Sequence, residues 1–170
     1  MNAKEIQSEF IKTYLKPTLK SFGYQTSGQT WWKNMGDFFI IINLQNSQWN
    51  SKEKISFCFN IGIALTEYVK DPKKKKATNF DILTYTREET YLSESRKKSK
   101  YREDGWLGYL ITENTNLDEF IIELKIDFEN EILITLEKLK TLKDCVEFYG
   151  EMKIWGEILK EQIEKIGLKV

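Results

Sequence analysis

The chain has 170 residues, of which 41% are hydrophobic and 14% aromatic, so it is long enough for one ordinary domain with a substantial core. Its 9 glycines and 2 prolines exclude a collagen-like or compositionally disordered chain, and its 2 cysteines exclude a disulfide scaffold. Because histidine is absent, mechanisms that use an imidazole as base, proton shuttle or metal ligand are excluded. We expect a single domain over residues 1–170.

The first segment, residues 1–23, predicts one helix. Asn2 and Glu5 have the spacing of a capping box, in which each side chain accepts a hydrogen bond from the other residue's backbone N–H. Apolar residues then recur at helical spacing, and Gly23 supplies a stop. Since Pro17 lacks an N–H, we expect the helix to kink or restart there.

The middle of the chain, residues 29–112, predicts an antiparallel sheet. Short turns separate apolar runs at residues 30–33, 38–48 and 55–65, and connections of this length require antiparallel hairpins. The third run alternates strictly, so one of its faces is predicted to be apolar, with Ile55, Phe57, Phe59, Ile61, Ile63 and Leu65. We therefore expect a meander of three strands.

The rest of this middle segment is less regular. Residues 82–86 fit either a strand or a short helix, residues 91–96 a fourth strand, and residues 105–111 a last strand. Polar residues at 70–76 and 97–104 indicate solvated loops. The complete sheet is expected to have about four to five strands.

The C-terminal third, residues 116–168, predicts helices. Asn116 and Glu119 repeat the capping-box spacing, and an apolar stripe continues over residues 117–142. A straight helix of that length, about 38 Å, would exceed a domain diameter of about 30 Å, so we expect it to bend, break or overhang. Asp144 is the candidate cap of a further helix. Helices before and after the sheet predict an α+β fold with N-terminal and C-terminal helices packed on one face of the sheet.

Several short stretches, taken in chain order, resemble one family. They are residues 10–19, 23–24, 42–45, 59–62 and 105–106, together with Trp32 and Arg96. They resemble the bacterial family catalogued as Domain of Unknown Function 4304. The family typically has a Cys-His or similar pair ahead of the arginine, where this chain has Tyr91 and Leu92, so no catalytic role carries over to that position. Because the family has no established activity, the resemblance implies a fold and no mechanism.

The small polar side chains of the central strands form the first candidate site. Asn43 and Gln45 alternate on one strand, and Ser56, Cys58, Asn60 and Gly62 alternate on the next. If these residues share a face, they make a shallow groove of amides, which suits ligand binding better than acid–base catalysis. Gly62 would allow close approach of a ligand or of another backbone. Alternatively, the small residues allow a helix to pack closely on this face of the sheet, or the face is exposed to solvent. The candidate ligand-binding residues are Asn43, Gln45, Asn60, Gly62, Arg96, Trp32, Trp49 and Trp106.

Charged clusters supply two further candidates. The basic stretch 73–102 has tyrosines interleaved, as in proteins that bind phosphates and stack bases, but its acidic neighbours and a pI near 6.4 favour solvated loops. Glu123, Asp127 and Glu131 follow one another at i,i+4, which suits a Mg²⁺ or Ca²⁺ site, an acidic docking surface or a solvated helix face. Residues 70–104 carry 11 basic and 7 acidic side chains, whereas residues 105–170 carry 8 and 14. The two segments therefore either dock on each other or face different partners.

Motifs for catalysis or nucleotide binding are missing from the sequence: it has no P-loop, no G-x-G-x-x-G, no G-x-S-x-G and no Cys–His pair. We expect no cofactor, no metal and no catalytic residue. Cys58 and Cys145 are expected to be reduced and buried. Since no signal peptide or membrane span is visible, we expect a cytoplasmic protein without a membrane partner.

The leading functional hypothesis is a bacterial binding protein, an antidote or adaptor that captures a protein partner through its acidic helices. The alternative is a small-molecule binder or enzyme that uses the polar face of the central strands, with Arg96 as an anion anchor. A third hypothesis is weak nucleic-acid binding through the basic loops. The protein is expected to be a monomer or a homodimer, with Trp31 and Trp49 exposed and free to form a dimer face.

Overall fold

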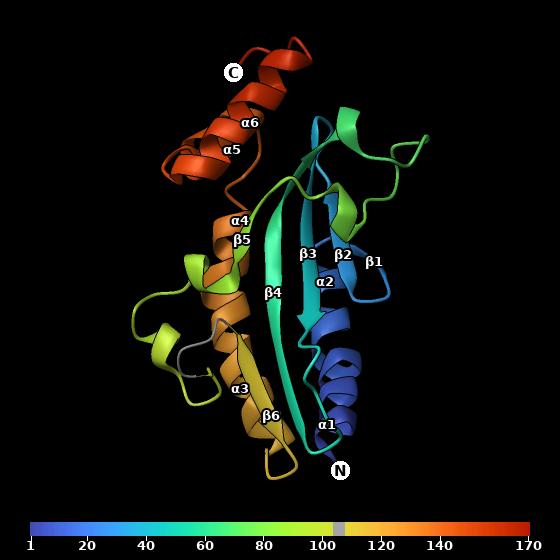
Figure 1. The fold of residues 1–170 in the computed structure, drawn as a ribbon, viewed down its shortest axis with the longest axis vertical. Coiled ribbons are helices and arrows are strands. Elements are labelled where there is room, and N and C mark those ends of the chain that lie inside the picture. Colours follow the sequence, from blue (N-terminus) through green and yellow to red (C-terminus); the bar gives the residue numbers. More distant parts are fainter. Residues whose placement is uncertain (104–107) are drawn as a thin grey trace.

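The computed structural model describes residues 1–103 and 108–170, and its elements run helix, sheet, helices along the chain (Figure 1). The first helix consists of α1 (Ala3–Phe10), a π-helical turn (Ile11–Leu15) and α2 (Lys16–Ser21). The predicted capping box is confirmed, with Asn2 Oδ1 accepting from the Glu5 N–H at 3.0 Å. The π-helical turn lies directly before Pro17, where the missing N–H interrupts the regular bonding pattern.

Six strands form one antiparallel sheet, which confirms the α+β fold class. They are β1 (Gln25–Ser27), β2 (Thr30–Asn34), β3 (Phe38–Asn46), β4 (Lys54–Leu65), β5 (Thr84–Arg87) and β6 (Tyr109–Thr112). The order is β1-β2-β3-β4, and β5 and β6 pair with the two halves of the same edge of β4. The predicted meander of three strands corresponds to β2, β3 and β4.

One face of the sheet is buried under the helices. The six alternating side chains of β4 that were predicted to share a face, from Ile55 to Leu65, all belong to this main core. Phe10 of the first helix packs against Phe57 of β4, with ring centroids 6.3 Å apart, and against Phe120 of the C-terminal helices at 5.1 Å. Helices from both ends of the chain therefore cover the same face.

The opposite face is covered over only part of its length. Trp32, Phe39, Ile41 and Ala64 form a second, smaller core with Val69, Ala77 and Ile82 from the connection between β4 and β5. Towards the β3–β4 hairpin, the residues of this face change to Asn43, Gln45, Cys58 and Asn60. The chain thus leaves a polar part of the sheet open beside a covered apolar part.

The C-terminal segment begins with α3 (Leu117–Asp127), a π-helical turn (Phe128–Ile132) and α4 (Leu133–Leu136). This helix ends at Leu136, so the predicted break occurs before Leu142. A helical hairpin of α5 (Leu142–Gly150) and α6 (Lys153–Lys165) follows. The prediction of Asp144 as a cap was wrong in position: Thr141 is the N-cap, and Asp144 accepts from the Thr141 N–H at 2.7 Å.

Other expectations also need correction. Residues 91–96 do not form a strand, since this part of the chain adopts short 3₁₀ turns (Glu88–Tyr91 and Arg96–Lys98). Of the expected last strand, residues 105–107 lie outside the described residues, and β6 begins at Tyr109. Trp31 is only 1% exposed because it pairs with Ile42 on the helix-covered face, so the expected exposure of Trp31 was wrong.

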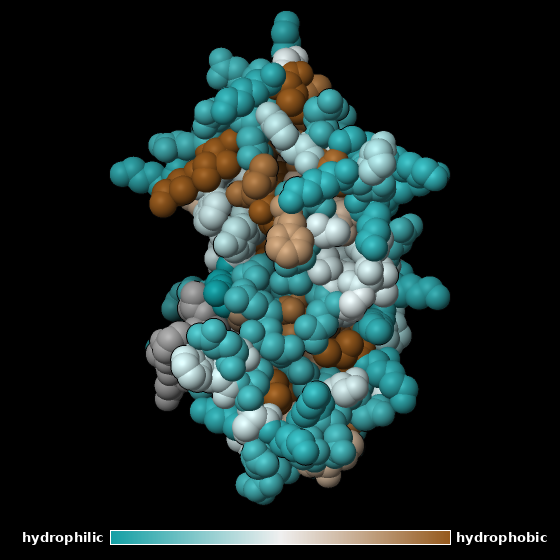
Figure 2. Space-filling model, turned by 45° about the vertical axis from the view of Figure 1, so that its right-hand side comes forward, coloured by the Kyte–Doolittle hydropathy of each residue, from teal (hydrophilic) through white to brown (hydrophobic). Residues whose placement is uncertain are grey.

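Exposed hydrophobic side chains gather towards the end of the molecule at which α5 and α6 lie (Figure 2). Ile154, Leu168 and Val170 are the exposed members there. Within residues 1–103 and 108–170, none of the helices has both the length and the apolar character required to cross a bilayer. Cys58 and Cys145 are buried free thiols.

Candidate functional site

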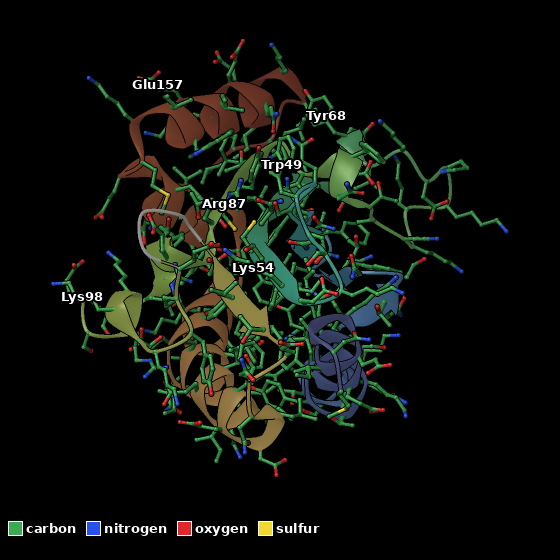
Figure 3. The ribbon with its side chains drawn as sticks, turned by 60° about the horizontal axis from the view of Figure 1, so that its bottom comes forward. Trp49, Lys54, Tyr68, Arg87, Lys98 and Glu157 are labelled. Atoms are coloured by element: carbon green, nitrogen blue, oxygen red, sulfur yellow. The ribbon has the colours of Figure 1, made fainter. Side chains whose placement is uncertain are left out.

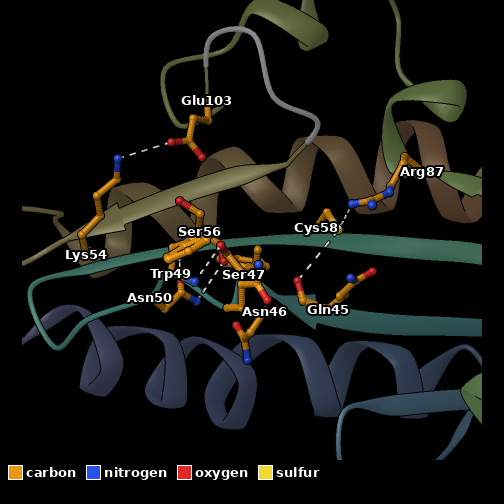
Figure 4. A pocket seen from close by; sticks show the side chains of 12 residues that line it. Gln45, Asn46, Ser47, Trp49, Asn50, Lys54, Ser56, Cys58, Arg87 and Glu103 are labelled. Carbon is orange, nitrogen blue, oxygen red and sulfur yellow. Dashed lines mark hydrogen bonds and ion pairs between the residues drawn. The ribbon is translucent and has the colours of Figure 1, made fainter.

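A cleft lies over the open part of the sheet, and we call it the hairpin cleft (Figure 4). It has a volume of about 660 Å³. Its lining comes from the end of β3, the β3–β4 loop, the start of β4, the end of β5 and the segment before β6. The lining residues are Gln45, Asn46, Ser47, Gln48, Trp49, Asn50, Lys54, Ser56, Phe57, Cys58, Arg87 and Glu103.

The β3–β4 loop is held in shape by side chains that replace strand hydrogen bonds. The Asn50 side chain accepts from the Ser56 N–H at 2.7 Å and donates to the Ser56 carbonyl at 3.0 Å. The Ser47 N–H also donates to the Ser56 carbonyl, at 2.9 Å. This local bonding leaves the Trp49 indole projecting from the loop, 86% exposed.

The floor of the cleft has the amide of Gln45 beside the thiol of Cys58. Gln45 and Cys58 are cross-strand partners, and the Asn60 amide donates to Gln45 Oε1 at 2.8 Å. Burial raises the pKa of Cys58 to about 11. The nearby Glu88 carboxylate also raises this pKa, whereas the Arg87 guanidinium lowers it. The Cys58 thiol is therefore protonated at neutral pH and is a poor nucleophile.

Arg87 stands at one end of the cleft and Lys54 at the other. Arg87 is the last residue of β5 and pairs in register with Asn60, so its side chain emerges on the polar face, where Nη1 contacts Cys58 Sγ. Lys54 is engaged by Glu103 at 3.4 Å. Trp49, Lys54 and Arg87 all line the cleft, and Figure 3 labels the three side chains on the whole molecule.

The side chain of the next residue, Glu88, bonds the edge of β4 between the stretches that pair with β5 and with β6. Neither β5 nor β6 pairs with β4 at Phe59, and the Glu88 carboxylate accepts from the Phe59 N–H at 2.6 Å. Arg102 donates to the same carboxylate at 2.7 Å. Because Glu88 is fully buried and its carboxylate already accepts these two hydrogen bonds, it is not available to a ligand in the cleft.

The structure brings some of the predicted site residues together. Asn43, Gln45 and Asn60 share the open polar face, and Trp49 lines the cleft. Gly62 lies further along the same face, under the backbone of β5: a Cβ at this position would lie 2.6 Å from Tyr85 Cα. Gly62 thus admits a neighbouring strand, which was one of the two alternatives the sequence left open.

Two other predicted residues lie elsewhere. Trp32 is buried in the smaller core, where its indole N–H donates to the Lys75 carbonyl at 3.2 Å. Arg96 lies against the C-terminal helix, bonded to Asp127 at 2.5 Å and to Glu123 at 2.9 Å. Trp106 lies outside the described residues. Neither Trp32 nor Arg96 is among the residues that line the cleft.

The basic and acidic segments dock on each other. Besides the Arg96 pairs, Lys100 donates to Glu119 at 2.7 Å and the Ser93 N–H to Glu131 at 2.6 Å. The interpretation of Glu123, Asp127 and Glu131 as a solvated face was therefore wrong, since Asp127 is 0% exposed. Burial raises the pKa of Asp127, although bonds from Arg96 and Tyr109 oppose this. Within the described residues, no group of three or more potential ligands is placed to hold a metal ion.

Sequence reasoning missed Arg87, Asn50 and Lys54. The available signal for Arg87 was the short alternation of residues 84–87, in which Tyr85 and Arg87 share one face of a strand. Asn50 and Lys54 lie in the turn between two predicted strands, and nothing local distinguishes them from ordinary turn residues.

Together, the fold and the cleft define an α+β domain with a helix-covered antiparallel sheet and an open polar face. A family model described as "Domain of unknown function (DUF4304)" matches residues 15–138. The chain belongs to this family. Comparison with curated proteins and with solved structures gives no match. All lining residues of the hairpin cleft fall inside the matched range, whereas α5 and α6 follow it.

Proposed function

We propose that this protein binds a small polar ligand in the hairpin cleft. The observation that carries the proposal is a cleft of about 660 Å³ that combines amides, the exposed indole of Trp49 and the guanidinium of Arg87. Small-molecule sites have volumes of roughly 300–1,000 Å³ and use a few convergent polar groups for orientation. Gln45, Trp49 and Arg87 are the groups of this kind in the cleft.

Binding without catalysis fits the chemistry of the lining. The thiol of Cys58 is held protonated by burial, and the chain contains no histidine to activate it. The amides of the floor do not titrate, so they orient a ligand without transferring protons. A bacterial cytoplasmic location belongs to the same proposal, because free buried cysteines suit a reducing compartment.

Thermal-shift screening of small polar metabolites tests this proposal. Gln45→Trp should fill the cleft, because Gln45 is exposed and faces into it, and should abolish the stabilisation by ligands that the unmodified protein shows. Lys98→Trp, an exposed position in a different segment, is the matched control and should keep the response. Ligands that stabilise Gln45→Trp as well as the unmodified protein would refute the cleft as the site.

Capture of a protein partner, as an antidote or adaptor, is the second candidate. It draws support from a hollow of about 460 Å³ on the α5–α6 hairpin, with Val146, Ile163, Leu168 and Val170 in its lining, and from Ile154, which is 67% exposed. A partner bound in this hollow should be lost with Val170→Ser and retained with Ile122→Ser, whose side chain is similarly exposed on α3. Equal retention by both variants would contradict this candidate.

A further inference from the structure

Arg87 differs from the other two arginines of the chain. Arg96 is paired with Asp127 and Glu123, and Arg102 with Glu88. Within residues 1–103 and 108–170, no carboxylate lies within ion-pair distance of Arg87, whose one side-chain partner is the neutral thiol of Cys58. The guanidinium in the cleft is thus the arginine whose charge is not compensated by the described part of the chain.

Because this guanidinium is half-buried, the lack of a counter-charge among the described residues is significant. Arg87 is shielded on one side by β4 and Cys58, where water solvates it less well than at a free surface. A guanidinium has five N–H donors in a planar fork, which matches the two oxygens of a carboxylate or phosphate. The Glu103 carboxylate on the same cleft is engaged by Lys54.

Further contacts are available around the position that an anion would take. The oxygen of the Gln45 amide accepts from Asn60, and the described residues show no acceptor for the Gln45 NH₂ group. That amide can donate to the same anion as Arg87, since both side chains line the cleft on either side of Cys58 (Figure 4). The exposed indole of Trp49 offers a flat apolar surface in the same cleft.

We infer that the ligand of the hairpin cleft is a small organic anion with a flat ring, whose carboxylate or phosphate binds Arg87 and Gln45 while the ring packs on Trp49. This inference rests on the proposed function and specifies the class of its ligand. It also assigns Arg87 as the anion-anchoring residue, a role that the sequence had suggested for Arg96.

Matched probes test the inference by separating charge from shape. Benzoate and benzamide have nearly the same shape but differ in charge, phenyl phosphate replaces the carboxylate by a phosphate, and acetate lacks the ring. Chemical shifts of the backbone amides of the unmodified protein are followed at probe concentrations up to about 10 mM. We expect benzoate or phenyl phosphate to bind at least about tenfold more tightly than benzamide, and acetate to bind more weakly than benzoate. Whichever of benzoate and phenyl phosphate binds more tightly shows whether the ligand of the cleft carries a carboxylate or a phosphate.

Variants of Arg87 supply the control. Arg87→Gln keeps a polar side chain of similar length and should reduce the affinity for the anion to that for benzamide, whereas Arg87→Lys should retain part of the preference. Lys98→Gln, which removes an exposed cation outside the cleft, should leave the preference unchanged.

The outcomes separate the inference from the proposed function. If benzamide binds in the cleft as tightly as benzoate, the inference is overturned while the cleft remains a binding site. A preference for the anions that survives in Arg87→Gln, or the absence of binding by every ring-bearing probe, also overturns the inference. The proposed function itself fails if ligands continue to bind the Gln45→Trp variant.

Discussion

Gly62 shows how a single residue determines where a strand can pair. The backbone of β5 passes so close to Gly62 that a Cβ would lie 2.6 Å from Tyr85 Cα, which is nearer than a side chain tolerates. Since Arg87 belongs to the same strand, the absence of a side chain at Gly62 also sets the position of the guanidinium in the cleft. The residue therefore acts on the site without touching a ligand.

Gly62→Ala should lower the free energy of unfolding by about 2–3 kcal/mol, because β5 must move away from β4. Gly150→Ala is the control: at this position in α5, the nearest atom to an added Cβ is the flexible Lys160 Nζ at 3.8 Å. Alanine there should be neutral or slightly stabilising. Urea unfolding of both variants measures the difference, and similar losses would contradict the close approach at Gly62.

Among the elements, the segment between β5 and β6 depends on contacts far away in the sequence. Arg96 lies 31 residues before Asp127 and 27 before Glu123, its two partners on α3. Asp127 also accepts from the Tyr109 hydroxyl at 2.8 Å, so one carboxylate connects this segment, α3 and β6. These bonds hold an irregular segment against a helix.

Replacing Arg96 by Met should destabilise the protein by about 3 kcal/mol, because the buried Asp127 would lose its charged partner. Lys98→Met removes an exposed charge two residues away and should change stability by less than about 0.5 kcal/mol. Chemical unfolding of the two variants gives the comparison. Equal stabilities would show that Arg96 does not hold this segment.

A structural feature could be predicted from the sequence where it depends on residues close together in the chain, and not where it depends on residues far apart. The capping box of Asn2 and Glu5 and the alternation of β4 are local, and both were evident in the sequence. The position of Arg87 depends on the pairing of β5 with β4, and the burial of Arg96 on acids of α3. A single sequence shows the charges but not these pairings, and for this reason it suggests Arg96 as the anchor and does not single out Arg87.

Viewed as a whole, the molecule has ionisable groups in its interior whose protons are released only at high pH. Burial raises the pKa of Cys58 to about 11, that of Cys145 to about 12 and that of Tyr91 to about 12. For each group the folded state retains its proton after the unfolded state has lost it. Above the unfolded pKa, stability therefore decreases as pH rises.

The free energy of unfolding should accordingly decline from about pH 9, the ordinary pKa of a thiol, and continue to decline to about pH 11. Cys58→Ala should weaken this decline, because it removes one of the groups that titrate in that range. Chemical unfolding at a series of pH values measures the slope. A free energy that is constant or increases between these two pH values would be inconsistent with buried, protonated thiols.

We propose that the open polar end of the sheet, and not the helical hairpin, is the ligand site. Chemical-shift mapping of the intact protein with a library of small fragments distinguishes the two locations. We predict that the shifted amides cluster at the β3–β4 loop, at Ser56 and Cys58, and at Arg87. Shifts that instead cluster around Val146 and Ile163, in the hollow of α5 and α6, would contradict the claim.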